Sequence, residues 1–457
     1  MGKAPTKHEM LNKRKQIRLP QLALTPKSRH RRCCEIAGWA SLVFVVLHAY
    51  RIISFFGWRG GFSIFLSRFW VGTELHALDY SLGFLPRAFS GSLLRLFVPA
   101  AYITESTIVV YLMIIHVLTY ALLAVIMGML IERALSTKNY MMCLVVALCI
   151  FMPQQIWYWS FSVMIWDTFL LLFALCAMLC VRHEKLKWFV PLLIFMGIAT
   201  NFVFILLLFP LVFALMYYEV VRSGFKRSRL VHIISTTVGT FFFWGFITWA
   251  IFNDHILSRV NVTQGIEFVQ QRVGRPLPPV WLWYISVNSF GACSCGEVLS
   301  LGYAFEFAHR PFTDFLQLYL LIFLVSLPIC TFALFIWRKF ARHAKGFWQK
   351  SPYLLFMIAP LAMFVITLLI TDRDRGVWGA LFTQILLLAY LFIHDWQSEV
   401  FAQIKAFFPK KHRWVWITAA VLIGISLTAI LFSGEGGIAP HDPLIHLLTL
   451  DYWCGMK

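Results

Sequence analysis

Charged residues are scarce in this sequence: they make up 13% of its 457 residues, whereas 60% are hydrophobic. A soluble domain carries about 25% charged residues, so the composition excludes an ordinary soluble globular protein. Long apolar runs recur along the whole chain, and a helix of about 20 apolar residues crosses the roughly 30 Å hydrocarbon core of a bilayer. The sequence therefore predicts a polytopic membrane protein.

Several familiar signals are missing, and each absence excludes a class of protein. The apolar runs do not alternate with polar residues, as the strands of an outer-membrane barrel would, so helices that satisfy their own backbone are expected. The chain also lacks a glycine-rich phosphate-binding loop, an HExxH zinc motif and a nucleophile elbow. We therefore expect an all-α membrane fold whose polar chemistry lies in its loops.

Basic residues outnumber acidic ones, which gives a net charge of +19. Such an excess can indicate nucleic-acid binding. Here, however, most basic residues lie in short segments between apolar runs, where Lys and Arg mark the cytoplasmic side. Residues 1–34 are thus expected to form a basic cytoplasmic tail that contacts membrane lipids, and no nucleic-acid partner is expected.

The positions of basic loops predict about 11 transmembrane helices between residues 35 and 432, with the amino terminus in the cytoplasm. Outer loops are expected at 58–98, 253–312 and 371–378, and an outer polar tail at 433–457. The apolar residues 188–220 have basic flanks on both sides, so we expect two spans hinged near Thr200–Asn201. The other spans are expected at 36–57, 99–131, 139–156, 162–181, 230–252, 315–337, 353–371, 379–394 and 414–432.

The outer loop 58–98 concentrates charge in a chain that is otherwise poor in it. Polar groups are costly beside lipid, so charges retained at a membrane boundary indicate a functional site. Asp79 is the first candidate for a catalytic general base that takes a proton from an acceptor hydroxyl, and Glu74 is the second. The alternative roles for Asp79 are the N-cap of a short interfacial helix and an ion pair with Arg87.

Candidate substrate-binding residues come from several segments that the topology places on the outer side. Arg87 is a candidate phosphate ligand, because a turn containing Gly and Pro would fix its direction; its ordinary alternative is snorkelling to the interface. Asn201, at the expected helix break, would bind substrate or cap its neighbouring helix. His309 and Arg310 complete this set of candidates.

The most highly charged tetrad of the chain is Asp372-Arg373-Asp374-Arg375. Carboxylates two residues apart can bridge a hard divalent cation, so Asp372 and Asp374 are candidate ligands for Mg²⁺ or Mn²⁺. Arg373 and Arg375 can bind phosphate oxygens in a bidentate manner. The alternative is a self-neutralising outer loop that anchors the following span at the lipid headgroups.

Two short motifs resemble those of bacterial membrane proteins of the GT-C glycosyltransferase class. They are Asp79 followed by Gly83-Phe84-Leu85-Pro86-Arg87, and Asp374-Arg375 followed by Trp378. The resemblance implies a multi-pass protein of the bacterial cytoplasmic membrane with its active site on the outer face. It also implies a polyprenyl-phosphate sugar donor and a glycan, lipid or protein acceptor. The chain departs from that class in lacking a large soluble carboxyl-terminal domain and a first-loop Asp-x-Asp pair, which puts metal dependence in doubt.

Two other functions stay open at this point. A polymerase or ligase of undecaprenyl-pyrophosphate-linked glycans would use a long late outer loop such as 253–312. A transporter or flippase of lipid-linked glycans would show inverted repeats and charges at mid-membrane depth. The charges here gather at one expected face and no convincing repeat is found, so an inverting glycosyltransferase is the preferred hypothesis.

Overall fold

Helices dominate the structure, a computed structural model that describes residues 35, 39, 73–85, 87–137, 167–252, 258–277, 331, 333–362 and 373–395. Every regular element in these residues is helical, apart from an isolated antiparallel bridge between Gly83 and Ser258. The expectation of a helical protein is confirmed for this part of the chain. The predicted tails 1–34 and 433–457 and the predicted spans 139–156 and 414–432 lie outside it.

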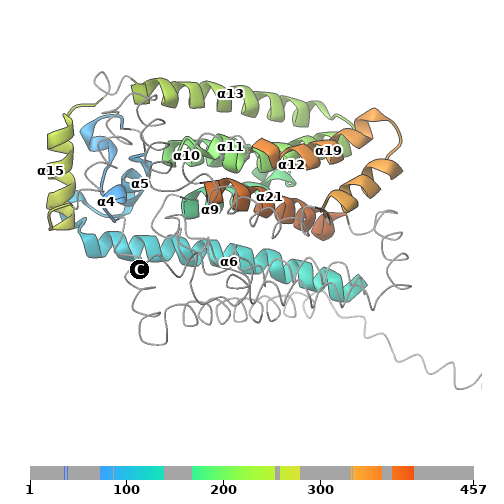
Figure 1. Cartoon of the computed structure of the whole chain (residues 1–457), viewed down its shortest axis with the longest axis horizontal. Coiled ribbons are helices and arrows are strands. Elements are labelled where there is room, and N and C mark those ends of the chain that lie inside the picture. The colour runs from blue at the N-terminus through green and yellow to red at the C-terminus, as the bar shows by residue number, and fades with distance from the viewer. Residues whose placement is uncertain are drawn as a thin grey trace, which may run out of the picture.

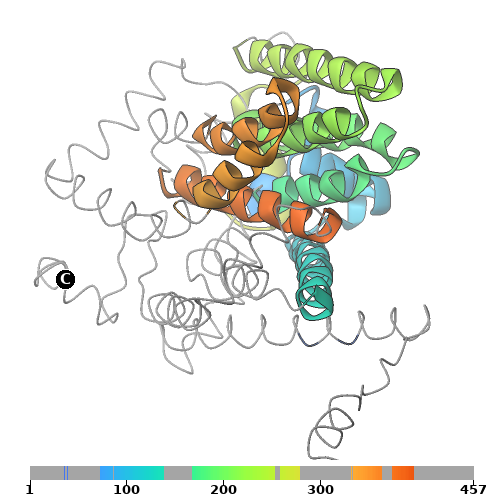
Figure 2. The same cartoon turned by 90° about the vertical axis from the view of Figure 1, so that its right-hand side faces the viewer.

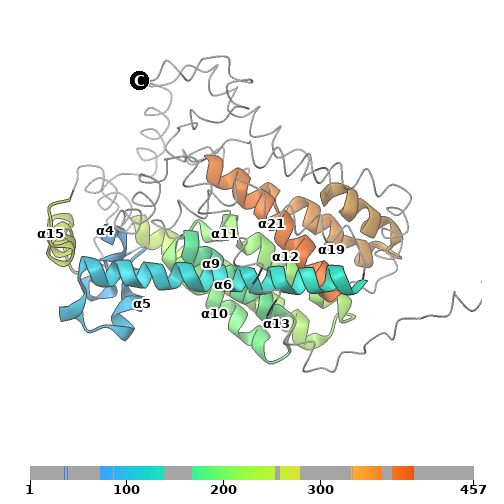
Figure 3. The ribbon, with the colours of Figure 1, turned by 90° about the horizontal axis from the view of Figure 1, so that it is seen from below.

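Two of the described helices are long and apolar enough to cross a membrane, as judged by length and composition. They are Glu105–Arg133 within α6 (Glu105–Thr137) and Arg227–Ala250 within α13 (Arg227–Phe252), with mean hydropathies of 2.5 and 1.6. In Figure 1 these helices form the lower and upper layers of a helical bundle, and Figure 3 shows α6 lying across the other helices. The predicted spans 99–131 and 230–252 fall on these two helices.

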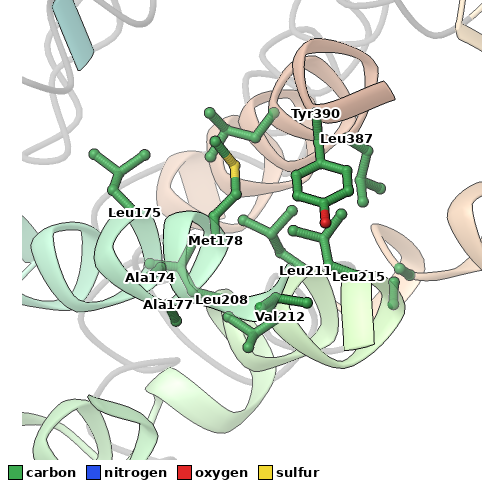
Figure 4. Close-up of a cluster of buried hydrophobic side chains, with 14 of the residues drawn as sticks. Ala174, Leu175, Ala177, Met178, Leu208, Leu211, Val212, Leu215, Leu387 and Tyr390 are labelled. Carbon is green, nitrogen blue, oxygen red and sulfur yellow. The ribbon is translucent and has the colours of Figure 1, made fainter. Parts of the chain in front are cut away.

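The middle of the bundle contains α9 (Asp167–Val181), α10 (Val190–Thr200), α12 (Phe209–Arg222) and α21 (Arg373–His394), seen from one end in Figure 2. Their buried faces share one hydrophobic core. Figure 4 shows Met178 of α9 on the side of that helix where Leu211 of α12 and Tyr390 of α21 lie. Apolar side chains surround these helices on several sides, which is why their sequences are continuous apolar runs.

The predicted break near Thr200–Asn201 is confirmed. Asn201 ends α10, and its side-chain oxygen accepts a hydrogen bond from the Val203 amide at 3.2 Å. The short helix α11 (Phe204–Leu207) follows, and Pro210 lies in the first turn of α12, where its missing N–H costs nothing. Gly197 allows this close turn, because a Cβ there would lie 2.7 Å from the Phe204 ring.

Several predicted boundaries are wrong. α6 begins at Glu105 instead of near 99, because residues 100–102 form the turn η2 (Ala100–Tyr102) and the Thr104 hydroxyl accepts from the Thr107 amide at 3.4 Å. α21 begins at Arg373, so the expected loop 371–378 is largely helix. α19 (Phe347–Ile358) also begins before the span expected at 353–371. The turn η4 (Leu186–Phe189) precedes α10.

Of the predicted outer loop 58–98, the structure describes residues 73–85 and 87–98. These residues form α4 (Thr73–His76), the turn η1 (Tyr80–Leu82) and α5 (Phe89–Phe97). α15 (Val262–Val273) lies in the segment expected to be the loop 253–312. These elements share a second, smaller core with the start of α6, and Figure 1 shows α4, α5 and α15 gathered at one end of the bundle.

Candidate functional site

The candidate site lies where α4, η1 and α5 meet α15. Gly91 of α5 makes this meeting possible, because a Cβ at that position would lie 2.0 Å from the backbone oxygen of Leu78. The backbone of α5 therefore lies directly against residues 76–78, which connect α4 to η1. His76 is also fixed there: its ring stacks on Phe169 with centroids 5.4 Å apart, and its Nδ1 lies 2.9 Å from the Ser90 hydroxyl.

Asp79 is the N-cap of η1 and is fully buried. Its backbone is extended, and its Oδ1 accepts a hydrogen bond from the Ser81 amide at 2.7 Å, as Asp commonly does at a helix start. Arg95 donates to the same oxygen at 3.2 Å, and Arg272 donates to Oδ2 at 2.6 Å. The N-cap role considered for Asp79 is thus present in the structure, and its ionic partners in the described residues are Arg95 and Arg272.

Arg272 is held in place by more than this ion pair. Its other terminal nitrogen donates to the backbone oxygen of Ala77 at 2.6 Å, and its guanidinium lies over the Phe268 ring, 4.1 Å from the centroid. Burial alone would raise the pKa of the Asp79 carboxyl. The hydrogen bonds from Ser81 and the Arg272 guanidinium lower this pKa by more than burial raises it, so the net shift is downward. Asp79 is therefore ionised and occupied on both oxygens.

Glu74 is also fully buried but is paired differently. Its Oε1 accepts a hydrogen bond from Arg275 at 2.7 Å, and the same guanidinium nitrogen lies 3.0 Å from Oε1 of Glu105. Thr73 donates its hydroxyl to Glu105 at 3.2 Å. The second carboxylate oxygen of Glu74, Oε2, has no hydrogen-bond partner among the described residues. This oxygen is the one unused acceptor of the pair of candidate bases.

Two of the three arginines that reach these carboxylates come from α15 and the residues just after it; the third is Arg95 of α5. Asn261 and Gln264 form a reciprocal capping box at its start, and Gly274 ends it in the left-handed conformation with a φ of 74°. Arg272 and Arg275 therefore flank the helix end. The Arg259 amide donates to the Leu82 backbone oxygen at 2.8 Å and holds the start of α15 against η1.

Sequence reasoning missed Arg272, Arg275 and Glu105 as members of this site. The capping pair Asn261 and Gln264 and the terminal Gly274 were the available signals for α15, since they match the start and stop pattern of a helix. No local pattern could have matched Arg272 and Arg275 to carboxylates about two hundred residues earlier in the chain.

Arg87 lies beside the Asn201 turn. It adopts a φ of 66°, which is uncommon for a residue other than glycine, and its guanidinium lies 5.2 Å from the centroid of the Phe202 ring. Asn201, of which 2% is exposed, uses its side-chain oxygen to cap the turn at Val203. The structure therefore places Arg87 beside Phe202, the residue after Asn201. Of the two roles considered for Asn201, the capping role is present in the structure.

The remaining predicted site residues are placed only in part. Arg373, Asp374 and Arg375 form the first turn of α21, and nothing is described of their side chains. Asp395, just after this helix, pairs with Arg222 at the far end of α12, so α21 begins toward the side of the bundle that holds Asn201. Asp372, His309 and Arg310 lie outside the described residues.

The described residues contain no group of three or more His, Cys, Asp or Glu side chains that could hold a metal ion. The proposed Mg²⁺ or Mn²⁺ ligands, Asp372 and Asp374, are not among the side chains that the structure describes, so this hypothesis stays a prediction. No protein-family model, curated protein or solved structure matches the chain.

Proposed function

We propose that this chain is a multi-pass membrane glycosyltransferase of GT-C type with about 11 transmembrane helices and a cytoplasmic amino terminus. It moves a sugar from a polyprenyl-phosphate carrier to a glycan, lipid or protein acceptor on the outer face of a bacterial cytoplasmic membrane. The observation that carries this proposal is Glu74, a buried carboxylate with one oxygen ion-paired and the other unused. It lies beside the start of α6, one of the two helices long enough to cross a membrane.

Glu74 fits the role of general base better than Asp79 does. A general base needs a lone pair that is free to take a proton. Oε2 of Glu74 accepts no hydrogen bond from the described residues, whereas both oxygens of Asp79 accept hydrogen bonds from guanidinium groups. We therefore assign the proton transfer to Glu74. Asp79 becomes a positioning residue that fixes α15, through Arg272, against η1.

In the proposed reaction the acceptor hydroxyl attacks the anomeric carbon of the donor sugar. A carbon–oxygen bond forms to the acceptor, the bond to the carrier phosphate breaks with inversion, and the hydroxyl proton passes to Oε2 of Glu74. Arg87, Arg373 and Arg375 would stabilise the charge that the phosphate gains on leaving. Asn201 holds the turn on which the Arg87 guanidinium lies.

The test is sugar transfer by the purified full chain in detergent, with a fluorescent polyprenyl-phosphate sugar as donor. Glu74→Gln should lower the transfer rate at least about 100-fold, which is the smaller end of what a positioned general base contributes. The matched control is Glu267→Gln on the exposed face of α15, which should keep the wild-type rate.

Three outcomes would contradict the proposal. A folded Glu74→Gln protein that transfers sugar at the wild-type rate would remove the base assignment. Flipping of the fluorescent lipid with no product would indicate a transporter or flippase. Joining of two pyrophosphate-linked glycans, with no use of the single-sugar donor, would indicate a polymerase or ligase.

A further inference from the structure

A cavity of about 400 Å³ lies between the helical residues 333–343 and α19. In Figure 1 this helix pair lies at the end of the bundle away from α4 and α15. Three cations, Arg338, Arg342 and Lys350, line the cavity together with apolar side chains. We call this cavity the basic groove.

The cations and apolar residues of the basic groove are separated along its length. On the first helix Arg338 and Arg342 lie one turn apart, and Leu334 lies one turn further from the connecting residues 344–346. On α19, Lys350 lies near this connection, whereas Leu354 and Met357 lie further along the helix, away from the connection. The cationic side chains therefore gather toward one end of the groove and the apolar ones toward the other, over about 12 Å, the rise of eight helical residues. The surface of the groove itself is mostly apolar, so the cations line it with their aliphatic stems.

The three cations of the groove are exposed and have no carboxylate partner among the described residues. This differs from the other end of the bundle, where Arg272 and Arg275 each pair with a buried acid. A concentrated positive charge next to an apolar surface complements a ligand that carries a phosphate and a hydrocarbon chain. Two aromatic residues in the first turn of α19 are exposed, Phe347 by 68% and Trp348 by 60%, and Trp is common at the lipid headgroup level.

We propose that the basic groove binds one anionic glycerophospholipid of the surrounding bilayer. Its phosphate would lie between Arg338, Arg342 and Lys350, and one acyl chain would run along Leu334, Leu354 and Met357. Basic pockets between helices on the cytoplasmic side of membrane proteins bind anionic headgroups in this way. The inference rests on the membrane placement of the proposed function and not on sugar transfer.

The experiment is native mass spectrometry of the purified full chain in micelles that contain phosphatidylglycerol or phosphatidylcholine. The wild-type chain should retain phosphatidylglycerol preferentially. Each change among Arg338→Gln, Arg342→Gln and Lys350→Gln should lower this preference about fivefold, the effect of removing one cation near a lipid phosphate. Lys345→Gln is the matched control, because Lys345 is exposed on the connection but does not line the groove.

A separate variant tests whether the apolar end of the groove contributes to lipid binding. Leu354→Asn should weaken the retention of both lipids, because it places an amide where the acyl chain would lie. Added inorganic phosphate should not displace the lipid. If phosphate displaces it fully, the groove is a site for a soluble phosphate compound.

Other results would also overturn the proposal. These are an unchanged lipid preference in a triple variant that combines Arg338→Gln, Arg342→Gln and Lys350→Gln, an equal loss in Lys345→Gln, and a dimer whose formation removes the bound lipid. Lipid retention is measured without a sugar donor, so a failure here is distinguishable from a failure of the Glu74→Gln transfer test.

Discussion

The chain buries two acid networks, and they differ in how completely their oxygens are used. In the first, which we call the α12–α21 network, Glu219 accepts hydrogen bonds from Tyr390 at 2.7 Å and from Arg222 at 3.4 and 3.5 Å. Asp395 accepts one from the Tyr218 hydroxyl and lies 3.3 Å from Nε of Arg222. All four carboxylate oxygens therefore have partners.

In the second network, around Glu74 and Asp79, one carboxylate oxygen lacks a partner among the described residues. A fully satisfied polar network stabilises one arrangement of its helices. An unsatisfied buried group costs free energy and needs another explanation, such as a role in catalysis. The comparison favours a structural role for the α12–α21 network and supports the proposal that the network at the other end of the bundle is the functional one.

Removing the cation of the α12–α21 network should give the largest loss of stability. Arg222→Leu leaves Glu219 and Asp395 without their shared guanidinium. Breaking a buried pair costs about 3–5 kcal/mol, and the lower end, about 3 kcal/mol, is expected because 38% of the Arg222 side chain is exposed. Thermal unfolding in detergent, followed by circular dichroism, measures this loss.

The matched control for this change is Lys226→Leu, which removes an exposed cation of the neighbouring turn. It should shift the unfolding midpoint little. Equal shifts in the two variants would show that the α12–α21 network does not stabilise the bundle.

The same chemical change should have different consequences in the two networks. Glu219→Gln replaces a carboxylate whose oxygens are all hydrogen-bonded, and it should cost about 1–3 kcal/mol. Glu74→Gln should lower the unfolding midpoint less, because Arg275 keeps its ion pair with Glu105 and the lost carboxylate had one unused oxygen. Parallel melts of the two variants test this. A large destabilisation by Glu74→Gln would assign that network a structural role as well.

Local features of the fold followed from the sequence, whereas its long-range pairings did not. The break at Asn201 and the two long apolar helices were predictable, because hydropathy and flanking charge are read from neighbouring residues. The charges around Glu74 and Asp79 also indicated a site. Their partners were not predictable: Arg272 lies on α15 and Arg275 lies just after it, in a segment that was expected to be a loop.

The start of α21 illustrates a second limit of sequence reasoning. Four alternating charges between two apolar runs suggested a loop, yet Arg373, Asp374 and Arg375 begin a helix. An acidic residue such as Asp374 is favoured in the first turn of a helix, where backbone amides are still free and the helix dipole attracts negative charge. Charge content alone therefore did not distinguish a loop from a helix end.

The smallest expected effect is a pH dependence of the ion pair that fixes α15. The pKa of Asp79 is lowered from its usual 3.8 in the folded chain, chiefly because the hydrogen bonds from Ser81 and Arg272 outweigh the effect of burial. A group whose pKa is lowered in the folded chain stabilises the fold at pH values above its unfolded pKa. This stabilisation is lost as the pH falls through the folded pKa.

The unfolding temperature of the wild-type chain should therefore decrease as the pH is lowered below 3.8, and this part of the decrease should be absent in Asp79→Asn. Glu267→Gln, on the exposed face of the same helix, should retain it. An unchanged acid decline in Asp79→Asn would show that the Arg272 pair contributes nothing to holding α15, and the positioning role assigned to Asp79 would then be wrong.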